Sequence, residues 1–285
     1  MLASADIMFA AVGGWEAINI KMQIAQTHGV FNILNTALHL PFVGLLAALV
    51  TKLIPDKAVE EDDEDDLGKP IHLETRLLNN PPMALSNAMH ELLRMNDFAM
   101  QTLNYARKYL FERNEEDKVN AYRVGKAVDV LDLKITNYVI EATFNKDVGQ
   151  AQSNKSYVIL QSVGDIERIG DHAENILELT DSCIEGNVEF SDDAKESLRA
   201  MFGHVQQIVV DAMNALEMND KELAKDVIGF DDMIDQMEAC LRKGHIDRLN
   251  AGQCTGTAGA IYLDIINNLE RIGDHCVNIA KYVLE

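Results

Sequence analysis

The chain of 285 residues carries a formal net charge of −21, from 46 acidic and 25 basic side chains, and only 6% of its residues are aromatic. All five prolines lie in the first 82 positions, so residues 83–285 contain none. A proline-free stretch this long argues against a turn-rich β-sandwich and predicts long, uninterrupted helices. The negative charge repels phosphate backbones and therefore argues against a nucleic-acid partner.

The four cysteines (Cys183, Cys240, Cys254 and Cys276) form no C-x-x-C pair and show no short regular spacing. Neither a zinc knuckle nor a disulfide framework is therefore predicted. This cysteine usage is typical of a reducing compartment.

Residues 30–54 are mostly apolar and contain one basic residue, Lys52. The stretch is long enough to cross a bilayer core of about 30 Å, so we predict a transmembrane helix. Its first half is more polar, which favours protein neighbours over lipid. Residues 1–20 contain two acidic residues and no basic segment, so no cleaved secretory signal is expected. The alternative for residues 1–54 is a soluble pair of hydrophobic helices.

Residues 55–82 have the composition of a linker. They contain seven consecutive acids at positions 60–66, then a Gly-Lys-Pro sequence and a double proline. Such runs are usually solvated spacers, and nothing in this segment indicates a specific ligand.

The remainder of the chain contains an internal repeat. Residues 157–176 align without gaps with residues 260–279, at an offset of 103 positions. Eight of ten residues in ERIGDHAENI match ERIGDHCVNI. The sequence therefore contains a duplicated unit of about 100 residues.

Each unit is predicted to form three helices, which gives an all-α fold. The first unit (83–187) divides into 83–112, 115–147 and 150–185, and the second unit (188–285) into 192–217, 219–249 and 253–284. Long helices joined by short turns predict two antiparallel three-helix bundles.

Acidic residues recur at matched levels in the second and third helices of each unit. In an antiparallel hairpin, residues equally distant from the turn lie side by side, and i,i+3 and i,i+4 spacings place side chains on one face. The predicted metal ligands are Asp129, Asp132, Glu167 and Asp171 in the first unit and Asp232, Asp235, Glu270 and Asp274 in the second.

Four carboxylates at one level destabilise a bundle unless a positive charge or protons lie among them. A metal ion held by oxygen ligands is one solution, and Mg²⁺, Mn²⁺, Ca²⁺ or iron would suit it, with His172 and His275 as further donors. The alternative is a solvated charged face on which Arg168 and Arg271 bridge the acids.

Catalytic motifs are not recognisable. None of the eight histidines follows a glutamate by three residues, so a di-iron oxidase of the ferritin type is not favoured. The sequence contains no Walker A motif or nucleophile elbow, and no serine or cysteine has a base at a recognisable spacing. Cys276 is interpreted as a core residue. We therefore predict that the protein is not an enzyme.

The paired ERIGDH motifs, with Asp-x-x-Asp motifs 35 residues upstream, resemble the PhoU family over residues 83–285. This resemblance implies a six-helix fold that binds metal clusters through its acidic motifs. It also implies regulation of phosphate uptake rather than catalysis.

Residues 19–54 resemble the end of the transmembrane part of bacterial sodium-dependent phosphate cotransporters, through AQTHGVFNILNT and LPFVGLLAALVTKLIP. LETRLLNNPPMAL resembles the segment that joins those spans to a cytoplasmic PhoU-like domain. The two inverted membrane repeats of that family, each with a Gln-Ser-Ser motif, are absent. The chain thus resembles the C-terminal part of a cotransporter, either as a fragment or as a membrane-tethered regulator.

These resemblances imply an inner-membrane location with the C-terminal domain in the cytoplasm. The implied partners are the membrane, the remaining transporter repeats and further copies of this chain, and sodium is implied only for a complete transporter. The alternative is a phosphate-signalling adaptor that binds a transporter ATPase or a sensor kinase.

Overall fold

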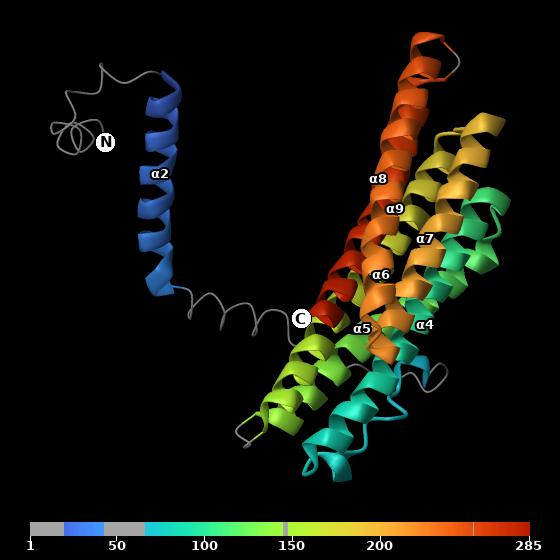
Figure 1. The fold of residues 1–285 in the computed structure, drawn as a ribbon. Helices are drawn as coiled ribbons and strands as arrows, with labels where there is room; N and C mark the ends of the chain where they lie inside the picture. The colour runs from blue at the N-terminus through green and yellow to red at the C-terminus, as the bar shows by residue number, and fades with distance from the viewer. Residues whose placement is uncertain (1–19, 43–65, 145–147, 253) are drawn as a thin grey trace. The chain divides into compact units, whose positions relative to one another are not determined.

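The computed structural model describes residues 20–42, 66–144, 148–252 and 254–285 (Figure 1). The chain divides into two compact units, Met1–Asp65 and Asp66–Glu285. Each unit is described by itself.

In the first unit, the described elements are helix α2 (Ile20–His39) and the 3₁₀ turn η3 (Leu40–Phe42). No helix in the described part of the chain is both long and apolar enough to cross a membrane. The predicted transmembrane helix over 30–54 is therefore wrong. Helix α2 begins ten residues before that stretch, takes in the polar residues of its first half and ends at His39. Residues 43–54 lie outside the described residues. The inner-membrane location depended on this helix and is corrected with it.

In its described residues, the second unit contains six α-helices and no strand. These helices are α4 (Pro81–Glu112), α5 (Glu115–Thr143), α6 (Gln150–Glu185), α7 (Asp192–Met218), α8 (Lys221–Asn250) and α9 (Gly256–Leu284). Two short 3₁₀ turns, η4 (Asp66–Gly68) and η5 (Thr75–Leu77), precede them.

The six helices form two three-helix bundles, as the repeat predicted. Helices α4, α5 and α6 pack against one another, and so do α7, α8 and α9. The bundles meet mainly through α6 and α9 and less extensively through α4 and α7, so the long helices run together through the unit (Figure 1). Alternating Leu, Ile, Val and Ala side chains fill the core, and Tyr109, Phe202 and Tyr262 are its largest fully buried side chains.

Local capping residues explain where the helices begin. The Asn114 side chain accepts a hydrogen bond from the Glu116 amide at the start of α5, and Ser191 and Thr255 cap α7 and α9 in the same way. Two prolines open α4, where their missing amide protons leave no helical hydrogen bond unmade. Each of these capping side chains satisfies a backbone amide that has no partner within its helix.

A segment before α4 is fastened to that helix by two side chains. Arg94 donates hydrogen bonds to the carbonyl oxygens of Leu67 and Lys69, each at 2.8 Å. The fully buried Glu91 carboxylate accepts from the amides of Ile71 and His72, at 3.0 and 2.7 Å. The second half of the predicted linker therefore packs against the bundle, while residues 55–65 lie outside the described residues.

A polar cluster at the end of the first bundle gives a stability prediction. Asp181 Oδ1 accepts from the Tyr109 hydroxyl at 2.6 Å, and Lys118 Nζ lies 2.7 Å from Asp181 Oδ2. Burial alone would raise the pKa of Asp181, but the hydrogen bonds from Lys118 and Tyr109 hold it below its ordinary value. We expect Asp181→Asn to lower the free energy of unfolding by about 1 to 2 kcal/mol at pH 7.

The pH dependence of this loss follows from the sign of the shift. A carboxylate whose pKa is lower in the folded state stabilises the protein above its unfolded pKa, and the contribution disappears as the pH falls through the folded pKa. Urea unfolding of both proteins should therefore give curves that converge as the pH falls below about 4. A difference that stays the same from pH 7 to pH 3 would contradict the assignment.

Candidate metal centre

Three of the predicted ligands in the first bundle come together. Asp129 on α5 and Glu167 and Asp171 on α6 each offer a carboxylate oxygen, and these oxygens lie within 4.8 Å of one another. Asp132 is not part of this trio, and Thr136 Oγ1 lies 3.5 Å from its Oδ1 as a hydrogen-bond donor. The hairpin register predicted from the sequence therefore places acids from both helices at one site.

The glycine of each ERIGDH motif lies where two helices approach closely. A Cβ atom on Gly170 would lie 3.5 Å from Val128 Cγ1, and one on Gly273 would lie 2.6 Å from Asp231 Oδ1. A side chain at Gly273 would displace the Asp231 carboxylate, since 2.6 Å is shorter than any normal carbon contact. The absence of a side chain at Gly273 therefore leaves space for the Asp231 carboxylate beside α9.

The acids of the first bundle favour protons or another cation. Burial raises the pKa of Asp129, and the nearby carboxylates of Asp171 and Asp132 raise it further. The pKa of Glu167 is raised by burial first and then by Asp171. Burial and the neighbouring carboxylates thus both disfavour the charged form of these two acids.

The alternative, in which an arginine bridges the acids, is observed in part. Arg168 Nη1 lies 2.8 Å from Asp171 Oδ2, and Arg168 Nε lies 3.4 Å from Glu167 Oε2. The Arg168 side chain is 59% exposed, so these pairs are solvent-screened and weak. The pKa of Glu167 stays raised in spite of this contact, which leaves room for a stronger cation.

Glu174 on α6 is a fifth acid of this cluster that sequence analysis missed. Its carboxylate lies over Gly125, where any Cβ atom would overlap it. Burial, followed by the charges of Asp129 and Asp171, raises the pKa of Glu174 to about 7. The i,i+3 spacing from Asp171 was the signal that could have identified it.

The second bundle holds its acids less tightly. Among the described residues, no three of its four predicted ligands bring their oxygens as close together as the trio of the first bundle. They still influence one another: burial and then Asp274 raise the pKa of Asp235 and of Glu270. Asp232 adds to the negative charge of this cluster, since its carboxylate raises the pKa of Asp235.

Asp231 on α8 is the fifth acid of the second cluster, and sequence analysis also missed it. Burial, followed by the charges of Asp235 and Asp274, raises its pKa to about 7. Its Oδ1 atom is buried and makes no hydrogen bond with the described residues. A buried carboxylate oxygen without a donor is a site that a proton or a metal ion can fill, so the donor set fits a cation.

These two acids do not occur at matching positions of the two repeats. At the offset of 103, Asp231 corresponds to Val128, and Glu174 corresponds to Val277. Each bundle therefore has a fifth acid, but on a different helix. A search for matching positions could not find them.

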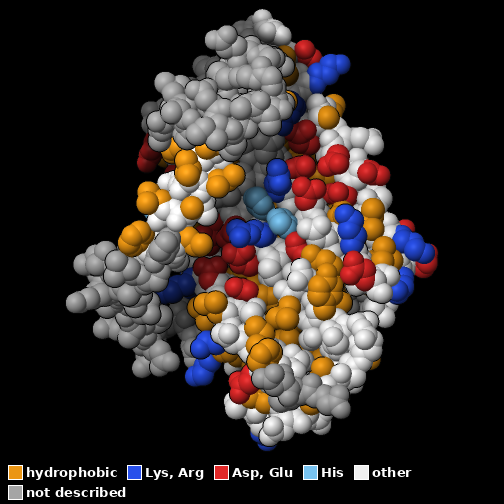
Figure 2. Space-filling model, turned by 90° about the vertical axis from the view of Figure 1, so that its left-hand side faces the viewer, with side chains coloured by type: hydrophobic (Ala, Val, Ile, Leu, Met, Phe, Trp, Pro, Cys, Tyr) orange, Lys and Arg blue, Asp and Glu red, His pale blue; other side chains and the backbone are white. Residues whose placement is uncertain are grey.

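The two histidines suggested as further donors lie between the bundles. His172 Nδ1 is 2.9 Å from Asn268 Oδ1, and His275 Nδ1 is 2.7 Å from Asp165 Oδ1, with the two rings 5.5 Å apart. Burial lowers the pKa of His172. The hydrogen bonds of both rings thus join α6 to α9. Figure 2 shows a face on which acidic side chains gather around histidine side chains.

Comparison with known protein families identifies the repeat. The PhoU domain family matches residues 92–180 and 198–283, which cover both bundles and most of the second unit. This protein belongs to the PhoU family. The two matches correspond to the two copies of the ERIGDH motif, so each three-helix bundle is one PhoU repeat.

Curated relatives of this PhoU protein fall into two groups. A phosphate-specific transport system accessory protein PhoU homolog of Thermotoga maritima is 29% identical over 70% of this chain and 78% of that protein. A putative inorganic phosphate export protein, YjbB, of Salmonella typhimurium is 23% identical over 90% of this chain. The chain spans about half the length of YjbB, 47%. This second match extends beyond Asp66–Glu285 into the residues that precede it.

Solved structures show the same fold. The crystal structure of PhoU from Pseudomonas aeruginosa has a TM-score of 0.65, 21% identity, and covers 70% of this chain and 95% of its own. PhoU from Streptococcus pneumoniae gives the same TM-score and covers 72% of this chain and 95% of its own. The predicted all-helical PhoU-like fold is thus confirmed, without its transmembrane segment.

Proposed function

We propose that this protein is a regulator of a phosphate transporter that acts by binding the transport protein and not by catalysing a reaction. The observation that carries the proposal is the presence of two complete PhoU repeats, each with an acidic cluster that faces the neighbouring helix. The names of the relatives support it, since they describe an accessory protein of phosphate transport and a putative phosphate exporter.

The proposed partner is a sodium-dependent phosphate transporter. The match to YjbB supports this choice, because it includes residues before the PhoU repeats. The resemblance of residues 19–54 to the cotransporter sequences supports it further. A second candidate is an adaptor that binds a transporter ATPase or a sensor kinase, which the match to the Thermotoga accessory protein favours.

We also propose that each bundle binds divalent metal or iron. The first bundle would use Asp129, Glu167 and Asp171, with Asp132 and Glu174 beside them. The second would use Asp232, Asp235, Glu270 and Asp274, with Asp231 among them. A bound ion would neutralise the carboxylates and hold the second and third helices of each bundle together.

The test compares a bacterium that lacks its own copy of this protein with the same bacterium expressing the full chain, and it measures phosphate uptake and efflux with and without sodium. We expect the two to differ in a sodium-dependent phosphate flux. We also expect the tagged chain to co-purify with the transporter. Co-purification with a transporter ATPase or sensor kinase, with sodium-dependent flux unchanged, would support the adaptor instead. Unchanged flux and no phosphate-related partner would overturn both candidates.

A further inference from the structure

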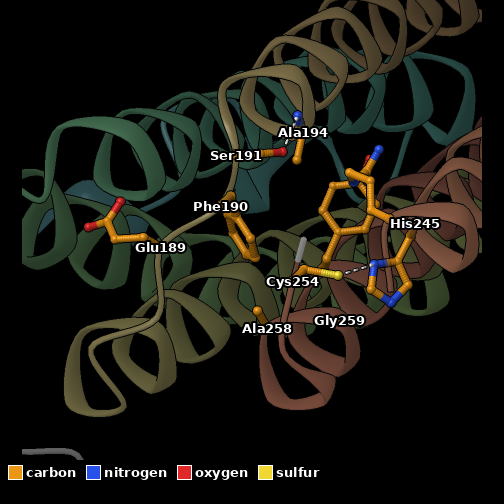
Figure 3. Close-up of a pocket in the computed structure, with 10 residues that line it drawn as sticks. Glu189, Phe190, Ser191, Ala194, His245, Cys254, Ala258 and Gly259 are labelled. Carbon is orange, nitrogen blue, oxygen red and sulfur yellow. Dashed lines mark hydrogen bonds between the residues drawn. The ribbon is translucent and has the colours of Figure 1, made fainter. Parts of the chain in front are cut away.

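A small cavity lies beside the N-terminal ends of α7 and α9, and none of the acids of the two clusters lines it. Its volume is about 30 Å³, and its polar lining includes His245 and Arg248 of α8, Cys254 in the turn before α9, and Tyr262 of α9 (Figure 3). Phe190 closes one side of it. This cavity has no part in the proposed metal centre.

Cys254 and His245 are in contact across the cavity. The Cys254 Sγ atom lies 3.8 Å from His245 Nδ1, within hydrogen-bond distance for sulfur (Figure 3). The imidazole is only 5% exposed and rests on Gly259, where any Cβ atom would overlap the ring. Burial and the nearby Arg248 lower the pKa of His245, so the ring is neutral at pH 7 and able to accept a proton.

Tyr262 lines the same cavity, and its hydroxyl lacks a hydrogen-bond partner among the described residues. Tyr262 is 2% exposed. Arg248 and Ser197 lie near it, but neither meets hydrogen-bond geometry. A buried hydroxyl without a partner is costly, so this group points to a polar ligand or product in the cavity.

The first bundle shows that the helical packing does not require these polar groups. At the offset of 103, the positions that correspond to His245, Cys254 and Tyr262 are Ala142, Ala151 and Ile159. Ala142 and Ile159 are fully buried and apolar. The polar trio is thus a feature of the second bundle that the fold itself does not explain.

We propose that Cys254 is a peroxide-reactive thiol, with His245 as its base and Tyr262 as the donor to the oxygen that is added. The thiol proton moves to His245 Nδ1, and the thiolate attacks one oxygen of hydrogen peroxide. The O–O bond breaks, sulfur loses two electrons and keeps one oxygen as sulfenic acid, and the leaving hydroxide takes the proton to form water. Tyr262 then donates to the sulfenic oxygen.

The cavity has room for a small oxidant. One water needs about 10 to 15 Å³ on the same measure, so a cavity of about 30 Å³ admits a molecule with two oxygen atoms. Hydrogen peroxide meets this limit. Cys254 is partly exposed, so peroxide reaches it from solvent.

The experiment treats the full chain with hydrogen peroxide, traps sulfenic acid with dimedone and quantifies each cysteine by peptide mass spectrometry. Cys240 is the matched control, because it is exposed and lies on the same helix as His245, whereas Cys183 and Cys276 are buried. We expect Cys254 to be trapped at least about tenfold faster than Cys240, although it is less exposed. Equal or slower trapping at Cys254 would overturn the proposal.

Two variants separate the roles of the neighbours. His245→Asn should slow trapping at Cys254 by about tenfold and leave Cys240 unchanged. The buried Cys183 and Cys276 should stay untrapped, which shows that the protein remains folded. Tyr262→Phe should leave the rate of Cys254 alkylation by iodoacetamide unchanged but lower the yield of trapped sulfenic acid several-fold. If His245→Asn leaves the ratio of Cys254 to Cys240 unchanged, His245 is not the base and the proposal fails.

Discussion

Addition of a divalent cation such as Mn²⁺ to the chelator-treated protein is expected to raise the thermal midpoint of Asp66–Glu285 by about 5 to 10 °C. Two sites, one in each bundle, at about ten times their dissociation constant together stabilise the folded state by about 2.8 kcal/mol. A unit of this size gains about 2 to 4 °C per kcal/mol. The physical source is relief of repulsion among five acids in each bundle. Circular dichroism during heating provides the measurement.

The pH dependence of the metal-free protein follows from the same acids. Glu174 and Asp231 each have a pKa of about 7, above their ordinary values of 4.5 and 3.8. The folded state therefore binds protons more tightly than the unfolded state, and its stability falls as the pH rises from about 4 to about 7. Because both groups are partly solvated, we expect a loss of about 1 to 2 kcal/mol. The cation should restore this loss above pH 7, where protons no longer compete for the ligands.

Matched variants identify the ligands. Asp171→Asn combined with Asp274→Asn removes one acid from each cluster and should abolish most of the cation-induced rise. Glu141→Gln removes one negative charge from an exposed position on α5, about 13 Å along the helix from Asp132, and should leave the rise intact. Metal analysis should give at least one ion per bundle. An equal rise in all three proteins, or no bound metal, would contradict the proposed site.

The part of this site that repeats could be predicted from the sequence. Helix length, turn residues and the offset of 103 predict which acids lie level, because an antiparallel hairpin has a simple register. Glu174 and Asp231 could not be identified in this way, since each corresponds to a valine in the other repeat. The orientation of His172 and His275 depends on how α6 and α9 pack together, which no local pattern encodes.

The N-terminal segment shows a different limit. Residues 30–54 satisfy the length and hydropathy expected of a membrane helix, but helix α2 begins at Ile20 and combines their polar first half with further polar residues. Boundaries decide whether a helix is apolar over its whole length, and boundaries are what a hydropathy pattern predicts least well. The contact of His245 with Cys254 was missed for a related reason: nine residues and a turn separate them, so no single-helix spacing applies.

Asp165→Ala is expected to cost about 3 to 4 kcal/mol, the largest effect of any single substitution considered. Asp165 is 8% exposed on α6 and accepts from three groups of α9: His275 Nδ1 at 2.7 Å, Asn278 Nδ2 at 3.1 Å and the Tyr282 hydroxyl at 2.9 Å. Burial, with the hydrogen bond to Asp165, raises the pKa of Tyr282, so this hydroxyl remains a donor. Removal of the carboxylate leaves all three donors without their acceptor.

Asn268 provides the matched control, because it corresponds to Asp165 at the offset of 103 and occupies the same place on the opposite side of the interface. It accepts from His172 and Asn175 without a charge and is partly exposed. Asn268→Ala should therefore cost only about 1 kcal/mol. Urea unfolding measures both losses, and equal losses would show that the charge of Asp165 is not what holds the interface.

Asp165→Ala also tests whether the two bundles unfold as one unit. Helices α6 and α9 make most of the contact between the bundles, and Asp165 is the charged acceptor at that contact. If this interface couples the repeats, its loss should divide one unfolding transition into two, with a midpoint lowered by about 6 to 16 °C for the less stable bundle. A single transition that only moves to lower temperature would mean that α4 and α7 are sufficient for coupling. The contact between α6 and α9 would then stabilise the unit without coupling one acidic cluster to the other.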